Sequence, residues 1–105
     1  MRPAKIVKEK LLERVRDAVA SGSYRILPHA RQRCTERDVS APDIERALEW
    51  GHHGPKRDRY DEPYEEWSYC FEGRSLDEER LRVVVAFDDG CCVVTVVRLD
   101  DSWEG

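Results

Sequence analysis

Apolar residues recur with helical spacing near the start of the chain, between charged residues. They predict an amphipathic helix over residues 5–20, which ends at the Ser-Gly-Ser sequence of residues 21–23. One stripe of this helix comprises Val7, Leu11, Val15 and Ala18, flanked by Leu12 and Val19.

The next stretch contains two further predicted helices. Residues 24–27 fit a short extended segment before Pro28, and residues 29–37 have helical composition without a helix breaker. Ser40 fits the N-cap of the following helix, and Asp43 lies three residues later, where a capping box usually has Glu or Gln.

Both ends of this last helix carry additional signals. Val39 and Ile44 occupy the two positions of a hydrophobic staple. The helix is expected to run to Trp50, where Gly51 would supply a left-handed C-terminal cap.

After this glycine the pattern changes to the spacing of strands. Residues 52–60 are polar and fit an edge strand, and in residues 67–72 aromatic side chains alternate with Ser, Cys and Glu. Residues 81–87 and 91–99 are Val-rich on both faces, which predicts two central strands. The Asp-Gly pair at residues 89–90 indicates a hairpin with a two-residue loop. That loop places Val84 opposite Thr95 and Arg82 opposite Val97.

The order of these elements predicts the fold class. Helices followed by strands indicate an α+β protein, with N-terminal helices packed on one face of a three- to four-stranded antiparallel sheet. A chain of 105 residues is expected to form a single domain. Residues 1–22 would form its N-terminal amphipathic helix and residues 24–99 its α+β core.

Charge is distributed unevenly along the chain. Residues 1–37 hold 10 basic and 4 acidic residues, a balance of +6, and residues 38–105 hold 8 and 18, a balance of −10. Such asymmetry arises by chance, or it marks a basic face that meets an anion. The acidic residues 61–66 would repel a phosphate backbone, so RNA is expected to approach from the helix side.

Several protein classes and kinds of site are disfavoured. No stretch approaches the roughly 20 apolar residues that cross a bilayer, and the N-terminus does not resemble a secretory signal, so we expect a cytoplasmic protein with no membrane partner. The four cysteines lack CxxC spacing and are expected to be small buried hydrophobic residues without disulfides. Adjacent His52 and His53 with Asp58 and Asp61 make a poor metal site, and no cofactor is expected.

The sequence HARQRCTER, residues 29–37, carries the most chemistry. His29, Arg33 and Arg37 are four residues apart, so on a helix they form one ladder that suits an anion. The imidazole adds a group that titrates near neutral pH. Alternatively, the arginines form ion pairs with Glu36 or other carboxylates and the histidine is structural.

Other residues are candidates for substrate contacts. Arg82 is unusual in a Val-rich strand and would share a sheet face with Thr95. Tyr24 and Tyr69 have rings that could stack on bases, although such residues are often half-buried in a sheet.

The HAxxR motif at His29, Ala30 and Arg33 is followed by Arg37, by Val39-Ser40 and by a helix that ends at Gly51. With the later Val-rich strand of residues 81–87 and the Thr-Val strand of residues 93–97, this pattern resembles the domain of unknown function 4258 family over roughly residues 24–99. That family is similar to the RelE/ParE-like proteins of the wider barnase-EndoU-colicin-RelE group.

The resemblance implies a compact RelE-like α+β fold. Many members of the wider group are metal-independent ribonucleases or toxins of toxin–antitoxin pairs. It therefore implies a toxin-like, metal-independent endoribonuclease that acts on RNA and is held by an antitoxin. Such cleavage needs an acid or base, for which His29 is the candidate, and cations on the phosphate, for which Arg33 and Arg37 are the candidates. The alternative is a non-catalytic RelE-like module that binds an antitoxin or DNA-binding protein.

Overall fold

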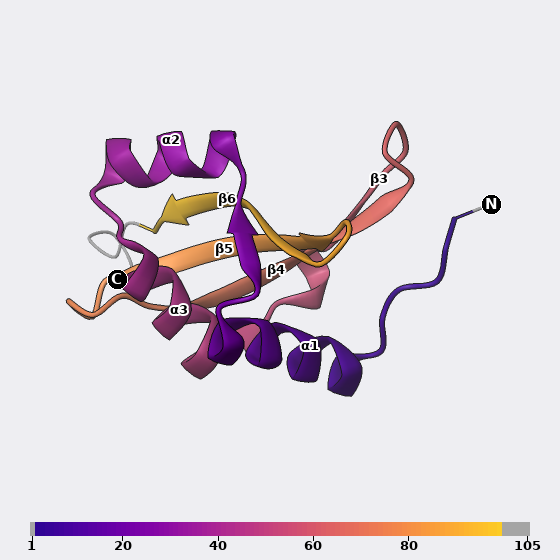
Figure 1. The fold of residues 1–105 in the computed structure, drawn as a ribbon, viewed down its shortest axis with the longest axis horizontal. Coiled ribbons are helices and arrows are strands. Elements are labelled where there is room, and N and C mark those ends of the chain that lie inside the picture. Colours follow the sequence, from indigo (N-terminus) through magenta and orange to yellow (C-terminus); the bar gives the residue numbers. More distant parts are fainter. Residues whose placement is uncertain (1, 100–105) are drawn as a thin grey trace.

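The structure, a computed structural model, describes residues 2–99 of the chain (Figure 1). Helices occupy most of its first half and strands most of its second half. The elements in chain order are α1 (Lys8–Ser21), β1 (Tyr24–Ile26), α2 (Pro28–Arg37), α3 (Ala41–Trp50), β2 (His52–His53), the 3-10 turn η1 (Pro55–Arg57), β3 (Arg59–Asp61), β4 (Glu66–Arg74), β5 (Arg80–Phe87) and β6 (Cys91–Arg98).

The strands form one mixed sheet in the order β1-β6-β5-β4-β2, with β3 also paired to β4. Every pairing is antiparallel except that of β1 with β6, which is parallel. The expected α+β class is confirmed, but the expected three- to four-stranded antiparallel sheet is wrong. Two short elements explain the difference: three-residue β1 joins the far edge of the sheet, and the polar segment after α3 divides into β2 and β3 around η1.

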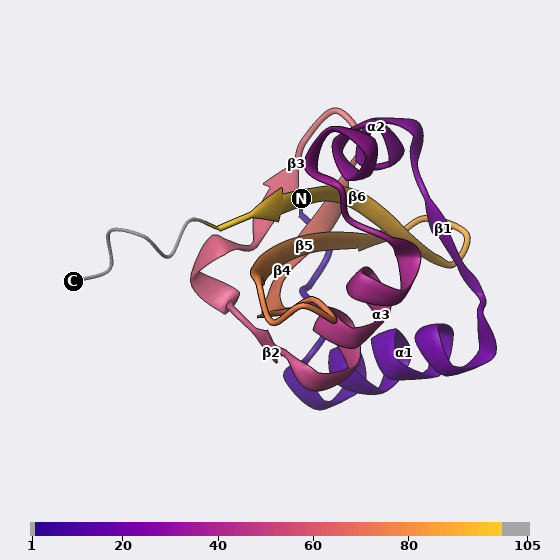
Figure 2. The same cartoon turned by 90° about the vertical axis from the view of Figure 1, so that its left-hand side faces the viewer.

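The hydrophobic core lies between the helices and one face of the sheet. Leu11 of α1, Ile44 of α3 and Phe71 of β4 are fully buried together. Helix α3 packs on β4 and β5, α1 packs on α3, and α2 packs along β6. Figure 2 shows α1 and α3 on one side of β4 and β5, and the segment between β2 and β3 on the other. We call this other side the open face of the sheet.

The β5–β6 hairpin has the predicted register beyond Val84, although its turn differs from the predicted one and a bulge follows. Both cross-strand pairs named above are confirmed. However, Phe87 pairs with Cys91, so residues 88–90 form a three-residue turn instead of the predicted two-residue loop. A bulge between Val84 and Val85 shifts the register by one residue and restores the predicted pairs beyond it.

The ends of α3 show one confirmed and one wrong prediction. The capping box is present, because Ser40 Oγ accepts from the Asp43 N–H at 3.3 Å and the Asp43 carboxylate accepts from the Ser40 N–H at 2.9 Å. Gly51 is not left-handed: its φ is −84° and its ψ −165°. Glycine is required there because a Cβ would lie 2.2 Å from the carbonyl oxygen of Ala47 and 2.3 Å from that of Glu72.

Helix α1 begins three residues later than predicted, so Val7 lies before it and is 62% exposed. Residues 2–6 cross the end of the sheet that carries β3 and β4. There Trp67 Nε1 donates to the Pro3 carbonyl at 2.8 Å, and the Ile6 N–H donates to the Tyr69 hydroxyl at 3.0 Å. The N-terminal segment is thus attached to β4 before the helix starts.

Candidate functional site

Strand alternation determines which polar side chains reach the open face. Because Phe71 and Val83 point into the core, their neighbours Glu72 and Arg82 point the other way. These two residues are cross-strand partners, and Arg82 pairs in turn with Val97 of β6. A carboxylate and a guanidinium therefore lie side by side on the open face.

Glu72 is the centre of a cluster of arginines. Its carboxylate lies 3.3 Å from Arg82 Nη2, 3.9 Å from Arg80 Nη2 and 4.0 Å from Arg57 Nε. The side chains of Glu72 and Arg82 are each 22% exposed, so this cluster is partly desolvated but open to a ligand. Nε of Arg82 is buried and has no hydrogen-bond partner among the described residues.

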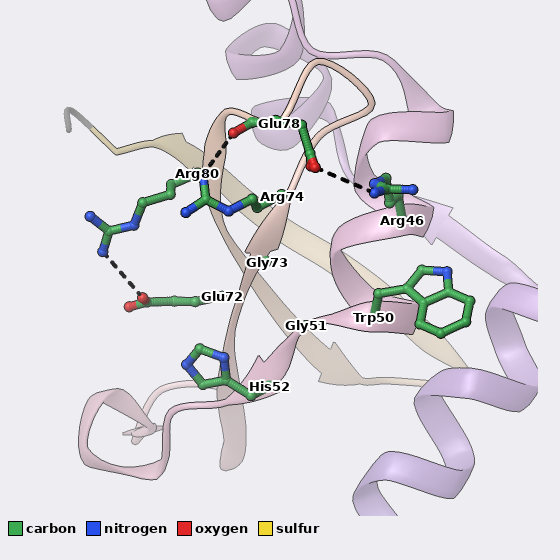
Figure 3. A pocket seen from close by; sticks show the side chains of 9 residues that line it. All are labelled: Arg46, Trp50, Gly51, His52, Glu72, Gly73, Arg74, Glu78 and Arg80. Carbon is green, nitrogen blue, oxygen red and sulfur yellow. Dashed lines mark hydrogen bonds and ion pairs between the residues drawn. The ribbon is translucent and has the colours of Figure 1, made fainter.

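His52 stands next to this carboxylate. It pairs with Glu72 across the β2–β4 ladder, and its side chain is exposed. Directly opposed residues of antiparallel strands have Cβ atoms about 4.5–5.5 Å apart. Figure 3 shows His52, Glu72 and Arg80 on the same side of the strands, with the imidazole beside the carboxylate. A base, an acid and cations are thus available within one small area.

Two hollows border the Glu72 cluster. The first, which we call the Trp50 hollow, has a volume of about 420 Å³ and has Glu72 and Arg80 of this cluster at one end (Figure 3). Its side-chain lining comprises Arg46, Trp50, His52, Glu72, Arg74, Glu78 and Arg80. The second, the basic hollow, is also about 420 Å³ and adjoins Arg82. Its polar lining comprises Lys56, Arg57, Asp58, Arg59, Ser68, Arg82 and Thr95.

Two glycines make the floor of the Trp50 hollow. Helix α3 lies so close to β4 that a Cβ on Gly73 would be 2.5 Å from the carbonyl oxygen of Ala47. Gly51 makes the equivalent close approach from the helix side. In Figure 3 these glycines separate Trp50 and Arg46 from Glu72 and its neighbours. The contact between backbones fixes the distance between the two ends of the hollow.

Asp58 holds η1 and its cations over the open face. Its Oδ1 accepts from the Cys70 N–H at 3.0 Å, and its Oδ2 lies 2.8 Å from His53 Nε2 and 2.7 Å from Lys5 Nζ. The Asp58 side chain is only 1% exposed and that of His53 5%. These residues therefore support the basic hollow from behind.

The metal site that the sequence disfavoured is divided in the structure. His53 turns inward to Asp58, whereas its neighbour His52 is exposed beside Glu72. Within residues 2–99, no group of three or more His, Cys, Asp or Glu side chains is placed to hold a metal ion.

Over the same residues, no helix has the length and apolar character needed to cross a membrane. Burial raises the pKa of the Cys70 thiol, which disfavours a thiolate nucleophile beside the basic hollow.

The predicted catalytic residues lie on α2, away from the Glu72 cluster. His29 is exposed, and Arg33 and Arg37 lie 3.0 Å and 3.9 Å from Glu36, whose side chain is 45% exposed. The pKa of Glu36 is lowered, chiefly by a hydrogen bond from Gln32 and then by Arg33. The arginines thus share an exposed carboxylate on their own helix.

The predicted substrate contacts separate into two groups. Arg82 and Thr95 both line the basic hollow, as their shared sheet face required. Tyr24 and Tyr69 lie on the core face: the Tyr24 hydroxyl donates to Glu45, and Tyr69 is only 2% exposed. The ring of Tyr69 is therefore covered where a stacked base would have to lie.

Sequence reasoning did not single out Glu72, Arg57 and Arg80 at the centre of this cluster, and it considered His52 only as a metal ligand. A signal for Glu72 was present, since it continues the alternation of residues 67–71 on the side opposite the aromatic rings. His52 had no comparable signal, because its place depends on the two-residue strand β2.

A family model described as Domain of unknown function (DUF4258) matches residues 26–98. This range contains both hollows, the Glu72 cluster and α2, and excludes α1. No curated protein and no solved structure matches the chain.

Proposed function

Because this chain belongs to the DUF4258 family, whose description names no activity, we propose a function from its own geometry: a metal-independent endoribonuclease that binds RNA on the open face and cleaves it at Glu72. One observation carries the proposal. A carboxylate lies within 4.0 Å of three guanidinium groups and beside an exposed imidazole. These are the groups that RNA cleavage requires when no metal takes part.

The proposed reaction assigns a role to each group. Glu72 removes the proton from a ribose 2′-hydroxyl, and the 2′-oxygen forms a bond to the adjacent phosphorus. The bond from phosphorus to the 5′-oxygen breaks, and protonated His52 donates a proton to that leaving oxygen. The products are a 2′,3′-cyclic phosphate and a 5′-hydroxyl. Arg80 and Arg82 stabilise the extra negative charge of the transition state through their planar guanidinium groups.

The basic hollow provides a path for the RNA backbone beside this centre. Lys56, Arg57 and Arg59 come from η1 and β3, and Thr95 adds a hydroxyl from β6. Asp58, the carboxylate nearest to these cations in sequence, is already bound by Lys5 and His53. In this proposal RNA binds the open face, whereas the distribution of charge along the sequence had suggested that RNA approaches from the helix side.

The proposal includes the similarity to RelE-like toxins that the sequence suggested. A RelE-like, toxin-type ribonuclease would carry its cations on a sheet face that its helices leave uncovered, as this chain does. An antitoxin could inhibit such an enzyme by covering the open face. The position of the Glu72 cluster on this face supports that arrangement.

One observation favours a second function, a non-catalytic module that binds a partner protein. Glu72 already forms ion pairs with Arg57, Arg80 and Arg82, so these charges could stabilise the sheet rather than bind RNA. The same experiment distinguishes the two functions.

The test measures cleavage of a mixed RNA substrate in EDTA by the original protein and by matched variants. Glu72→Gln and His52→Gln remove the proposed base and acid with little change of shape. His29→Gln and Arg33→Gln make equivalent changes on α2. Circular dichroism checks that each variant is folded.

We expect cleavage that resists EDTA and falls about 10²- to 10⁴-fold in Glu72→Gln and in His52→Gln. The α2 variants should stay within about threefold of the original rate. The opposite pattern would place catalysis on α2 at His29 and Arg33. No cleavage by purified protein, on free RNA or on ribosomes, would favour the interaction module.

A further inference from the structure

Trp50 is a large aromatic residue that the fold leaves exposed. It ends α3, is 77% exposed and lines the Trp50 hollow. Arg46 lies one turn earlier on the same helix, where side chains four residues apart are neighbours. Exposing an indole leaves apolar area in water, and nothing in the core requires it at this position.

The hollow joins this indole to the proposed cleavage centre. Trp50 and Arg46 occupy one end, Glu72 and Arg80 the other, and the two glycines lie between them (Figure 3). A volume of about 420 Å³ is within the range of small-molecule sites, roughly 300–1,000 Å³. A ligand that fits both ends needs an anionic group and a flat ring, separated by a short linker. A nucleotide has this form.

We propose that Trp50 is the stacking platform for the nucleobase next to the scissile phosphate, an inference that rests on the proposed function. The base lies on the indole, the scissile phosphate lies among Arg80, Arg82 and His52, and Arg46 contacts the next phosphate. Aromatic rings stack on every base, so the subsite selects for a base that is free of pairing. The substrate is therefore single-stranded RNA, with little preference for sequence at this position.

The charges around Trp50 favour this ligand over an apolar protein surface. Arg46 and Arg74 lie in the same hollow, and Arg46 is 3.6 Å from Glu78. Both partners in that ion pair are well exposed, at 42% and 60%, so the pair is weak and a phosphate can replace the carboxylate. Arginine beside an exposed aromatic ring also adds cation–π attraction for a stacked base.

The test measures binding of fluorescently labelled single-stranded RNA by anisotropy. All riboses carry 2′-O-methyl groups, so the strand cannot be cleaved and binding is read separately from catalysis. A second strand has the same backbone without bases. The proteins are the original chain, Trp50→Ala, Trp50→Phe and the control Tyr64→Ala, since Tyr64 is equally exposed, at 75%, on the turn before β4.

We expect Trp50→Ala to weaken binding of the base-bearing strand about tenfold. Trp50→Phe should stay within about threefold, Tyr64→Ala should have no effect, and affinity for the strand without bases should not change in Trp50→Ala. Equal affinities of Trp50→Ala and the original protein for the base-bearing strand would overturn the inference. So would an equal loss for both strands, or no binding of either strand by the original protein.

Failure of the proposed function gives a different result. If the original protein binds the methylated strand through Trp50 but does not cleave unmodified RNA, the stacking subsite stands and the catalytic proposal falls. If it cleaves RNA and Trp50→Ala binds both strands normally, the catalytic proposal stands and the stacking subsite falls.

Discussion

Replacing Asp58 with Ala should destabilise the protein far more than replacing any exposed acidic residue. Asp58 is 1% exposed and contacts the Cys70 N–H, His53 and Lys5 at 3.0, 2.8 and 2.7 Å. The variant leaves a buried N–H without an acceptor, which costs about 1–3 kcal/mol. Removing one partner from a buried ion pair costs about 3–5 kcal/mol in all. Because Lys5 is 36% exposed and can be solvated, we expect a total near 3 kcal/mol.

Urea denaturation followed by fluorescence measures this loss as a lower midpoint at an unchanged m-value. Lys5→Ala should cost about 1 kcal/mol or less, because its ammonium group is partly in water. Asp61→Ala, at an exposed position at the end of β3, should change the free energy of unfolding by less than about 0.5 kcal/mol. A loss below about 1 kcal/mol in Asp58→Ala would refute the view that this carboxylate anchors η1.

Three further outcomes follow from the packing and the hydrogen bonds. Gly73→Ala should cost about 2–3 kcal/mol in urea denaturation, because its Cβ would lie 2.5 Å from the Ala47 carbonyl; an unchanged midpoint would contradict this close approach. Ser40→Ala removes the N-cap acceptor and should cost about 1 kcal/mol by the same measurement, whereas no change would mean that the cap contributes nothing. Burial, and then the hydrogen bond to Glu45, raise the pKa of Tyr24 from 10.0 to about 12. The stability that comes from this shift is present below pH 10 and is lost as the pH rises towards 12; ultraviolet titration against Tyr24→Phe measures the pKa, and a value near 10 would disprove the shift.

Local rules predicted the elements whose structure depends on neighbouring residues. The capping box at Ser40 and Asp43 needs only four consecutive residues, and it is present. The Val-rich runs predicted β5 and β6 because strands that are apolar on both faces are buried in the centre of a sheet. The bulge after Val84 was not visible in the pattern, since it replaces one valine pairing with another.

Contacts between distant residues could not be predicted in this way. Gly51 was assigned the usual role of a glycine after a helix, but its actual constraints are the Ala47 carbonyl of its own helix and the Glu72 carbonyl of β4, which lies about twenty residues further along the chain. The same holds for the site. The ladder of His29, Arg33 and Arg37 was evident from spacing. Glu72, His52 and Arg57, in contrast, come together only when β2 pairs with β4 and η1 packs beside them.

The pairing of β1 with β6 affects how the protein folds while it is being synthesised. Strand β6 lies between β1 and β5, yet it comes after every other strand of residues 2–99 in the sequence. During synthesis, β1 and one edge of β5 therefore have no strand to pair with until residues 91–98 have been made. The parallel pair Tyr24–Cys91 joins positions far apart in sequence, and such contacts form late in folding. A nascent chain of this protein thus exposes a Val-rich strand edge until β6 is made, which makes that interval the time of greatest risk of aggregation.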